Sequence, residues 1–415
     1  MTSDMFRMGL IGTGGIAKTH IRAMAELKQH GLDGFVLSAV CDMNPQNAEE
    51  AAAMCEEMLG HRPTIYADYR DMLEKETGPG GAGLDGADLC LPHGLHHTVS
   101  IDVMDADVHV LCEKPLGITI KASRLMAEAA DRTGKILSVA VPYRRLPGMR
   151  LVQWALNDSG LIGTPTMFFN TMARGGQRRP PSAGPLPYAA QWRRDRLMSG
   201  GGPAMDGGFH WCDGIRYLLG DIDTIYARAI EQGQGEIRSL PDVREDSVFA
   251  VATFKNGITG TWSWSFDAPG EGFQKVLFYG SEGSISTDIG HAIFHLFWRG
   301  NDWIETGTMT QRDGTQLDFD QLKALQKQAL SDEKWEFLFP AGIENGFGYE
   351  IWEFMEVIRG NRDKVEVDAW DGMKSLAVCE AVYESATCGE VVKVDDVLSG
   401  KIDAYQAPIN AHWNI

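Results

Sequence analysis

The stretch Phe6-Arg7-Met8-Gly9-Leu10-Ile11-Gly12-Thr13-Gly14-Gly15-Ile16-Ala17 decides the fold of the first part of the chain. Its first half is a short apolar run that predicts a buried β-strand, and the apolar period of residues 16–29 predicts a helix after the glycines. In that setting Gly12 permits a tight turn, Gly14 lets a pyrophosphate approach the backbone, and Ala17 lets the helix pack on the strand. The helix N-terminus supplies amide donors for the phosphates. The stretch therefore predicts a dinucleotide site with contacts from Gly12, Thr13, Gly14, Gly15 and Ile16.

Strand and helix patterns keep alternating over the first third of the chain. Short apolar runs predict further strands at residues 35–41, 87–91, 109–112 and 136–141. Helical periods lie between them at residues 44–58, 69–76, 96–105 and 119–132. This alternation is typical of βαβ units and of a parallel sheet covered on both faces. It favours a ligand-binding turn over the alternative, a tight strand–helix turn that binds nothing.

An acidic residue ends the second predicted strand. Asp42 follows Val40 and Cys41, and no basic residue comes after it. A carboxylate at this place accepts hydrogen bonds from the adenosine ribose hydroxyls and repels a 2′-phosphate. The sequence therefore predicts NAD, in preference to NADP, as the cofactor.

The pattern changes after about residue 145. Strand-like runs dominate, and the Asn256-Gly257 pair between two of them predicts a hairpin with a type I′ turn. The expected strands lie at residues 164–172, 224–231, 247–254, 258–266, 273–279, 284–287 and 292–298. Helices are expected at residues 149–158, 209–219, 349–359 and 370–388. We therefore predict an α/β domain with a parallel sheet over residues 1–145 and an α+β domain with a mostly antiparallel sheet over residues 146–415.

Three aromatic residues alternate along the expected strand at residues 258–266. Trp262, Trp264 and Phe266 share one face because side chains repeat every two residues in a strand. Such a face is either packed inside the domain or covered by another subunit, since a large wet apolar patch is rare.

Bulk properties exclude several classes of partner. Of 415 residues, 44% are hydrophobic and 23% charged, as in an ordinary globular protein, and the formal net charge is −19. That charge argues against nucleic acid and against an anionic membrane surface. No stretch approaches the ~20 apolar residues of a membrane helix, and no export signal is recognisable. Seven scattered cysteines without a C-x-x-C pair indicate a reducing compartment, so we expect a cytoplasmic protein.

Two segments carry candidate catalytic groups. Lys114 follows the apolar run at residues 108–112 and so lies at the carboxyl end of a parallel strand, where ligands of such sheets bind. Asp206 and His210 are four residues apart after the run Gly200-Gly201-Gly202-Pro203, so on a helix they share a face. A histidine beside a carboxylate suits a general base near neutral pH. A solvated lysine and a hydrogen-bonded core histidine are the alternatives for these segments taken singly.

Together these motifs resemble the Gfo/Idh/MocA family of sugar and cyclitol dehydrogenases over residues 6 to about 390. The resemblance rests on Gly12-x-Gly-x-x-Ala17, Pro92-x-x-x-His96, Glu113-Lys114-Pro115 and Gly202…Asp206-x-x-x-His210. It implies a Rossmann domain followed by a domain on an open, mostly antiparallel sheet, whose exposed face joins subunits into a homodimer or homotetramer. It also implies that Lys114, Asp206 and His210 are the catalytic trio.

Further contacts follow from the same resemblance. Cofactor contacts are expected from Leu91, Pro92, His93, His96, Glu113 and Lys114, although Leu91-Pro92-His93 replaces the family's usual Thr-Pro-Asn. Substrate contacts are expected from Lys114, Tyr143, Arg144, Asp206 and His210, with Pro142 standing where Asn or His is common. Apart from the resemblance, the arginines of residues 173–194 are conspicuous in an acidic chain. We expect a mixture of surface charges, intersubunit pairs and one or two groups that bind polar parts of the substrate, with Arg178, Trp192 and Arg193 as the candidate substrate contacts. An anionic sugar would suit them.

No metal is expected. His93, His96 and His97 lie close together, but no cysteine or carboxylate stands near them at ligand spacing.

The sequence thus predicts oxidation of a secondary hydroxyl of a sugar, glycoside or cyclitol, with hydride passing to NAD. His210, oriented by Asp206, is the candidate base, and Lys114 stabilises the developing alkoxide; the sequence leaves open whether these two exchange roles. Two other functions remain. One is an NAD-using glycosidase that acts by transient oxidation and elimination. The other is a non-catalytic NAD-binding regulator, which would have no need of a base.

Overall fold

The computed structural model describes residues 5–174, 188–231, 235–236, 245–287 and 306–415. The chain forms two compact units, Met1–Arg145 with Glu336–Met373, and Leu146–Trp335 with Lys374–Ile415. The sequence predicts two contiguous domains, 1–145 and 146–415. Residues 336–373 differ from that expectation because they pack with the N-terminal unit: Val139 donates its N–H to Val367 O at 2.9 Å, and the Phe354 ring packs edge-on against Phe6 at 6.1 Å.

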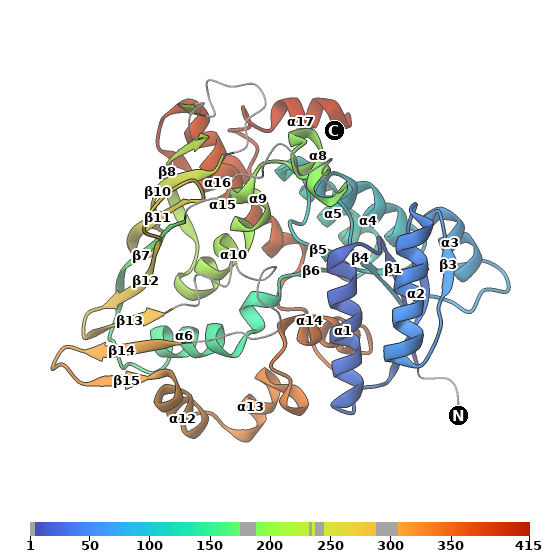
Figure 1. The fold of residues 1–415 in the computed structure, drawn as a ribbon, viewed down its shortest axis with the longest axis horizontal. Helices are drawn as coiled ribbons and strands as arrows, with labels where there is room; N and C mark the ends of the chain where they lie inside the picture. Colours follow the sequence, from blue (N-terminus) through green and yellow to red (C-terminus); the bar gives the residue numbers. More distant parts are fainter. Residues whose placement is uncertain (1–4, 175–187, 232–234, 237–244, 288–305) are drawn as a thin grey trace. The chain divides into compact units, whose positions relative to one another are not determined.

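The first unit is built around a parallel sheet. Its strands are β1 (Phe6–Ile11), β2 (Phe35–Cys41), β3 (Thr64–Tyr66), β4 (Gly86–Leu89), β5 (His109–Glu113) and β6 (Leu137–Ala140). Its helices are α1 (Gly15–Gln29), α2 (Pro45–Leu59), α3 (Tyr69–Thr77), η1 (His93–Leu95), α4 (His96–Asp105), α5 (Ile120–Thr133), η2 (Pro142–Arg145), η4 (Pro340–Gly342) and α14 (Gly346–Ile358). The strand order is β3-β2-β1-β4-β5-β6, and α1 and α2 lie on the opposite face from α4 and α5 (Figure 1).

This strand order places the candidate cofactor residues at one edge of the sheet. The order reverses between β1 and β4, and ligands of such sheets bind beyond the carboxyl ends of the strands at that point. The glycine turn follows β1, Asp42 follows β2, and Lys114 follows β5. The sequence prediction of βαβ units is therefore confirmed.

The second unit is built around a larger, mostly antiparallel sheet. Its strands are β7 (Pro165–Ala173), β8 (Ile222–Glu231), β9 (Gly235–Glu236), β10 (Ser247–Phe254), β11 (Thr259–Ser265), β12 (Phe273–Gly280), β13 (Gly283–Thr287), β14 (Gly307–Gln311), β15 (Gln316–Asp318) and β16 (Val392–Lys393). Its helices are α6 (Pro147–Asn157), α7 (Tyr188–Trp192), α8 (Arg196–Ser199), α9 (Pro203–Asp206), α10 (Gly208–Leu219), α12 (Phe319–Ala329), α16 (Val394–Leu398) and α17 (Ala407–Trp413). Helices α13 (Asp332–Leu338) and α15 (Ala369–Cys388) each cross a boundary between the units.

The order of this sheet is β15-β14-β13-β12-β7-β11-β10-β8-β16, with β9 paired to β8. Among the strands that the structure describes, all pairs of this sheet are antiparallel except β11 with β7. Most expected strands are confirmed within two residues of their ends. The short strands β9, β14, β15 and β16 were missed, and the expected strand at residues 292–298 lies outside the described residues.

One face of the sheet packs against helices, including α6 and α10 (Figure 1). Trp262 and Trp264 are each 2% exposed, and Trp211 of α10 stacks on Trp262 with ring centroids 4.3 Å apart. A Cβ on Gly208 would lie 2.8 Å from the Trp262 ring, so the helix can approach only because that residue is glycine. The interpretation of the tryptophan face as a packed interior is confirmed.

The Asn256-Gly257 hairpin is also confirmed, but the predicted type I′ turn is wrong. Of the two residues only Gly257 has a positive φ, at +89°. Its N–H bonds to Phe254 O at 2.9 Å, and Phe254 N–H bonds to Ile258 O at 2.8 Å. The loop is therefore a type I turn followed by a left-handed glycine, the usual form of the next-longer hairpin.

Within the described ranges, no helix has both the length and the apolarity needed to cross a bilayer.

Candidate active site

The glycine turn has the geometry of a phosphate cradle. Gly12 has φ +84°, and a Cβ there would lie 2.4 Å from Cys90 O, so only glycine fits. Gly14 caps α1 without a side-chain hydrogen bond. A Cβ at Gly14 or Gly15 would meet nothing within 4 Å, so open space lies before the helix N-terminus. These features fit a dinucleotide pyrophosphate.

Asp42 is held against this turn. Its Oδ2 accepts from the Thr13 N–H at 2.8 Å and from Thr13 Oγ1 at 3.0 Å. Its Oδ1 accepts from the Asn44 N–H at 2.8 Å. The carboxylate is therefore fixed at the end of β2, beside the cradle, where it can accept further bonds from a ribose and repel a phosphate.

His96 joins two loops at the same edge of the sheet. Its Nδ1 lies 2.8 Å from Pro115 O and its Nε2 lies 2.9 Å from Leu91 O. Burial lowers the pKa of His96, so the ring is neutral and donates to one of these carbonyls at a time. The ring thus faces the backbone of its own unit. Pro92 is the N-cap of the 3₁₀ turn that His93 begins, and the His93 ring is buried 5.8 Å from that of His96.

Lys114 follows β5 directly and is 6% exposed. Its N–H donates to Glu113 Oε2 at 3.0 Å, and the Lys114-Pro115 peptide bond is cis. Glu113 therefore holds the backbone of the residue that carries the candidate catalytic amine.

Tyr143 and Arg144 lie in η2, after β6. Tyr143 is buried, which raises the pKa of its hydroxyl well above the ordinary value. Arg144 donates to Asp371 Oδ2 at 2.7 Å. A role of Arg144 in substrate binding stays a prediction, and the sequence reasoning missed its ion pair with Asp371.

In the second unit, Asp206 and His210 lie on two successive helices instead of one. Asp206 ends α9, and α10 begins at Gly208. Gly207 keeps helical angles of −74° and −37°, and the His210 N–H bonds to Gly207 O at 3.3 Å. The backbone therefore stays helical at Gly207, with a tighter i→i+3 hydrogen bond, and the chain does not change direction there. His210 is 3% exposed.

The carboxylate of Asp206 has a partner that the sequence did not predict. Arg193 donates from Nε to Asp206 Oδ2 at 2.8 Å. The Arg193 guanidinium also lies 4.3 Å from the centroid of the Trp192 ring, a cation–π distance. Arg193, Trp192 and Asp206 are thus brought together, whereas Arg178 lies outside the described residues.

Two further residues hold the segment that leads to Asp206. The Tyr383 hydroxyl accepts from the N–H groups of Gly202 at 3.0 Å and Met205 at 3.1 Å, and it donates to Glu245 Oε1 at 2.8 Å. Glu245 Oε1 also accepts from the Ala204 N–H at 2.7 Å. Sequence reasoning missed both residues. The glycine run signalled a close approach, but its partners lie about 40 and 180 residues further along the chain.

Comparisons with known proteins agree with this arrangement. Residues 6–141 match the Gfo/Idh/MocA oxidoreductase family model with an NAD-binding Rossmann fold, and residues 154–286 match a Gfo/Idh/MocA C-terminal domain. Levoglucosan dehydrogenase of Pseudarthrobacter phenanthrenivorans is 27% identical over 94% of each chain. Myo-inositol 2-dehydrogenase of Thermotoga maritima is 26% identical over 68% of this chain and 75% of its own length.

Solved structures share the fold. An oxidoreductase domain protein from Kribbella flavida superposes with a TM-score of 0.71 at 22% identity, covering 94% of this chain and 99% of its own. A levoglucosan dehydrogenase in complex with NADH gives a TM-score of 0.68 at 22% identity, with the same coverage. With the glycine cradle, the Rossmann strand order and matches to both domain models in place, the chain belongs to the Gfo/Idh/MocA family of NAD-binding oxidoreductases.

Proposed function

We propose that this oxidoreductase oxidises a secondary hydroxyl of a sugar, glycoside or cyclitol and uses NAD as the hydride acceptor. The observation that carries the cofactor assignment is the Asp42 carboxylate, which Thr13 and Asn44 fix beside the glycine turn. The substrate class is supported by the names of similar proteins, levoglucosan dehydrogenase and myo-inositol 2-dehydrogenase. Both names denote rings that carry several secondary hydroxyl groups.

When bound, NAD supplies the acceptor for the hydride that leaves the carbinol carbon. The chain's part is to hold it: the open N-terminus of α1 at Gly14, Gly15 and Ile16 would bind the pyrophosphate, and Asp42 the adenosine ribose. We assign further cofactor contacts to Leu91, Pro92, His93 and Glu113, on the strength of the family resemblance.

Removal of hydride leaves a hydroxyl proton that a base must accept. We assign this proton to His210 and the stabilisation of the alkoxide oxygen to the Lys114 ammonium group. Asp206 would orient His210, and Arg193 holds the Asp206 carboxylate in a fixed position. Tyr143, Arg144, Trp192, Arg193 and Arg178 complete the proposed set of substrate contacts.

We further propose that the chain forms a homodimer or homotetramer through the open sheet face. Strand register places Tyr226, Val251, Thr261 and Phe169 in one row across β8, β10, β11 and β7. Val251 is 46% exposed and Phe169 40% exposed. An apolar patch of this kind is typical of an interface. Seven free cysteines, six of them buried, support a cytoplasmic location.

The test is a screen for NAD reduction over sugars, glycosides, inositols and sugar acids, followed by substitution. We expect Lys114→Met and His210→Asn each to lower turnover about 10²- to 10⁴-fold. Lys121→Met and His412→Asn are matched controls, because both residues are exposed, and they should leave turnover unchanged. Near-wild-type turnover by Lys114→Met would refute the proposal. Release of free sugar without net NADH would indicate the glycosidase, and NAD binding without turnover of any substrate would indicate the regulator.

A further inference from the structure

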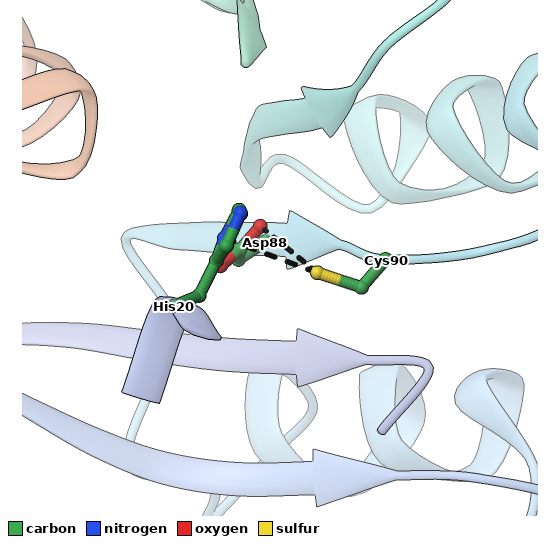
Figure 2. A group of neighbouring side chains, drawn as sticks. All are labelled: His20, Asp88 and Cys90. Atoms are coloured by element: carbon green, nitrogen blue, oxygen red, sulfur yellow. Dashed lines mark hydrogen bonds and ion pairs between the residues drawn. The ribbon is translucent and has the colours of Figure 1, made fainter. Parts of the chain in front are cut away.

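A group of buried ionisable side chains lies inside the first unit. His20 comes from α1, Asp88 from β4, Cys90 from the residues after β4, and Glu113 from the end of β5. Figure 2 shows the His20 ring, the Asp88 carboxylate and the Cys90 sulfur facing one another. His20 and Asp88 are fully buried, and Glu113 is 5% exposed. Buried charges at this density need a specific arrangement of protons or ions to be stable.

The first question is whether the group holds a metal ion. One ligand atom each from His20, Asp88 and Cys90 lies within 4.8 Å of the others. However, His20 Nδ1 is only 2.7 Å from Asp88 Oδ2, whereas two ligands on a tetrahedral zinc ion stand roughly 3.3 Å apart. Burial also raises the pKa of the Cys90 thiol, so the sulfur keeps its proton. The distances are those of a hydrogen-bonded group.

The protons of that group follow from its acceptors. His20 Nδ1 faces Asp88 Oδ2, and His20 Nε2 faces Glu113 Oε1 at 3.1 Å. Ionised carboxylates only accept hydrogen bonds, so both contacts are satisfied only when both ring nitrogens carry a proton. His20 is then an imidazolium between two carboxylates. Burial by itself lowers the pKa of His20, but the contacts with Asp88 and Cys90 together outweigh burial, and the pKa lies well above its ordinary value.

Glu113 transmits this arrangement to Lys114. One of its oxygens bonds the His20 ring, and the other accepts the Lys114 N–H at 3.0 Å. Helix α1, which carries His20, begins at the glycine turn. A single ring therefore ties the helix of the cofactor cradle to the strand end that bears the candidate catalytic amine.

We propose that the His20 imidazolium is a positioning residue for the reaction, because through Glu113 it fixes the backbone from which the Lys114 side chain extends. The inference rests on the function proposed above for Lys114. His20 does not touch the reacting atoms, so its loss acts only through Lys114.

A double-substitution cycle tests this. We expect His20→Gln to lower kcat about 10- to 100-fold, the effect of misplacing a reacting group by about 1 Å, with little change in KM for NAD. In the Lys114→Met background, His20→Gln should lower kcat by less than about threefold, because the two substitutions remove the same effect. Cys90→Ala is the matched control: it removes a neighbour of His20 and leaves both carboxylate contacts in place, so turnover should stay at the wild-type level. Losses that multiply in the double variant would overturn the proposal.

A second measurement uses the unaltered protein. Nitrogen NMR on histidine-labelled enzyme at about pH 8 should show both His20 nitrogens protonated, well above the ordinary histidine pKa. The groups that face the ring are Asp88 and Cys90, Glu113 from β5, and Glu350 from α14, whose own pKa burial raises. A neutral His20 would overturn the inference and leave the proposed function standing. If Lys114→Met instead keeps full turnover, the proposed function fails, and the role of His20 in it fails as well.

Discussion

Replacement of Tyr383 by phenylalanine would remove one oxygen atom from the support beneath the candidate catalytic segment. That oxygen accepts two hydrogen bonds, from Gly202 and Met205, and donates one to Glu245. The ring itself would remain, stacked on Tyr405 with centroids 4.5 Å apart. The substitution therefore isolates the hydrogen bonds from the packing.

The expected cost follows from those three bonds. Two neutral bonds contribute about 1 kcal/mol each and a bond to a carboxylate about 2 kcal/mol, so the free energy of unfolding should fall by roughly 4 kcal/mol. The freed amides lie in the segment that ends at Asp206 and precedes His210, so turnover should fall about tenfold or more as that segment loosens.

Urea unfolding followed by tryptophan fluorescence measures the first effect, since Trp211, Trp262 and Trp264 are buried in the same unit. Steady-state turnover with the substrate found in the screen measures the second. Tyr405→Phe is the matched control, because it removes a hydroxyl from the stacked ring and leaves the bonds of Tyr383 to Gly202, Met205 and Glu245 in place. A Tyr383→Phe protein no less stable than Tyr405→Phe would refute the reasoning.

Three variants test other parts of the structure. Asp42→Ala should weaken NADH binding about 10- to 100-fold through the loss of charge-assisted bonds and should improve NADPH binding; fluorescence titration with both cofactors measures this, and an unchanged preference contradicts it. In the wild-type protein the folded state keeps the His20 proton, whereas the unfolded chain releases it above about pH 6.5. Relative to His20→Gln, the free energy of unfolding of the wild type should therefore fall by about 1.4 kcal/mol for each pH unit of increase. If urea unfolding from acid to alkaline pH shows the same pH dependence of the unfolding free energy for both proteins, the result argues against the imidazolium. A Phe249→Lys, Val251→Lys protein should fall to a smaller assembly in light scattering without loss of fold, because both side chains are 46% exposed on the open sheet face; an unchanged mass would place the interface elsewhere.

The sequence predicted best what depends on neighbouring residues. The strand–turn–helix at Gly12, the hairpin at Gly257 and helix α10 each follow from local period and turn chemistry, and each is found in the structure. The turn type at Asn256 was wrong because the same pair of residues suits two hairpin loops, and only the backbone distinguishes them.

The features that the sequence did not predict depend on contacts between distant parts of the chain. Residues 336–373 pack in the first unit, and no local sequence pattern indicates this, because an apolar helix such as α14 could cover either sheet. Strands β14 and β15 are short and rich in polar residues, and they are defined only by their pairing, β14 with β13 and β15 with β14. The partner of Asp206 was likewise missed, since Arg193 was expected to contact the substrate and no local pattern indicates its bond to Asp206.

The fit of the glycine run against Tyr383 has a consequence for genetics. A Cβ on Gly201 would lie 2.5 Å from the Tyr383 hydroxyl and 2.6 Å from the ring carbon that bears it. Tyr383→Phe would therefore not suppress the defect of Gly201→Ala, because phenylalanine keeps the ring. A smaller residue at position 383 would relieve the clash, but it would also remove the hydroxyl that holds Gly202 and Met205. No single second-site change restores both space and hydrogen bonding, so selection for revertants of Gly201→Ala should return glycine itself.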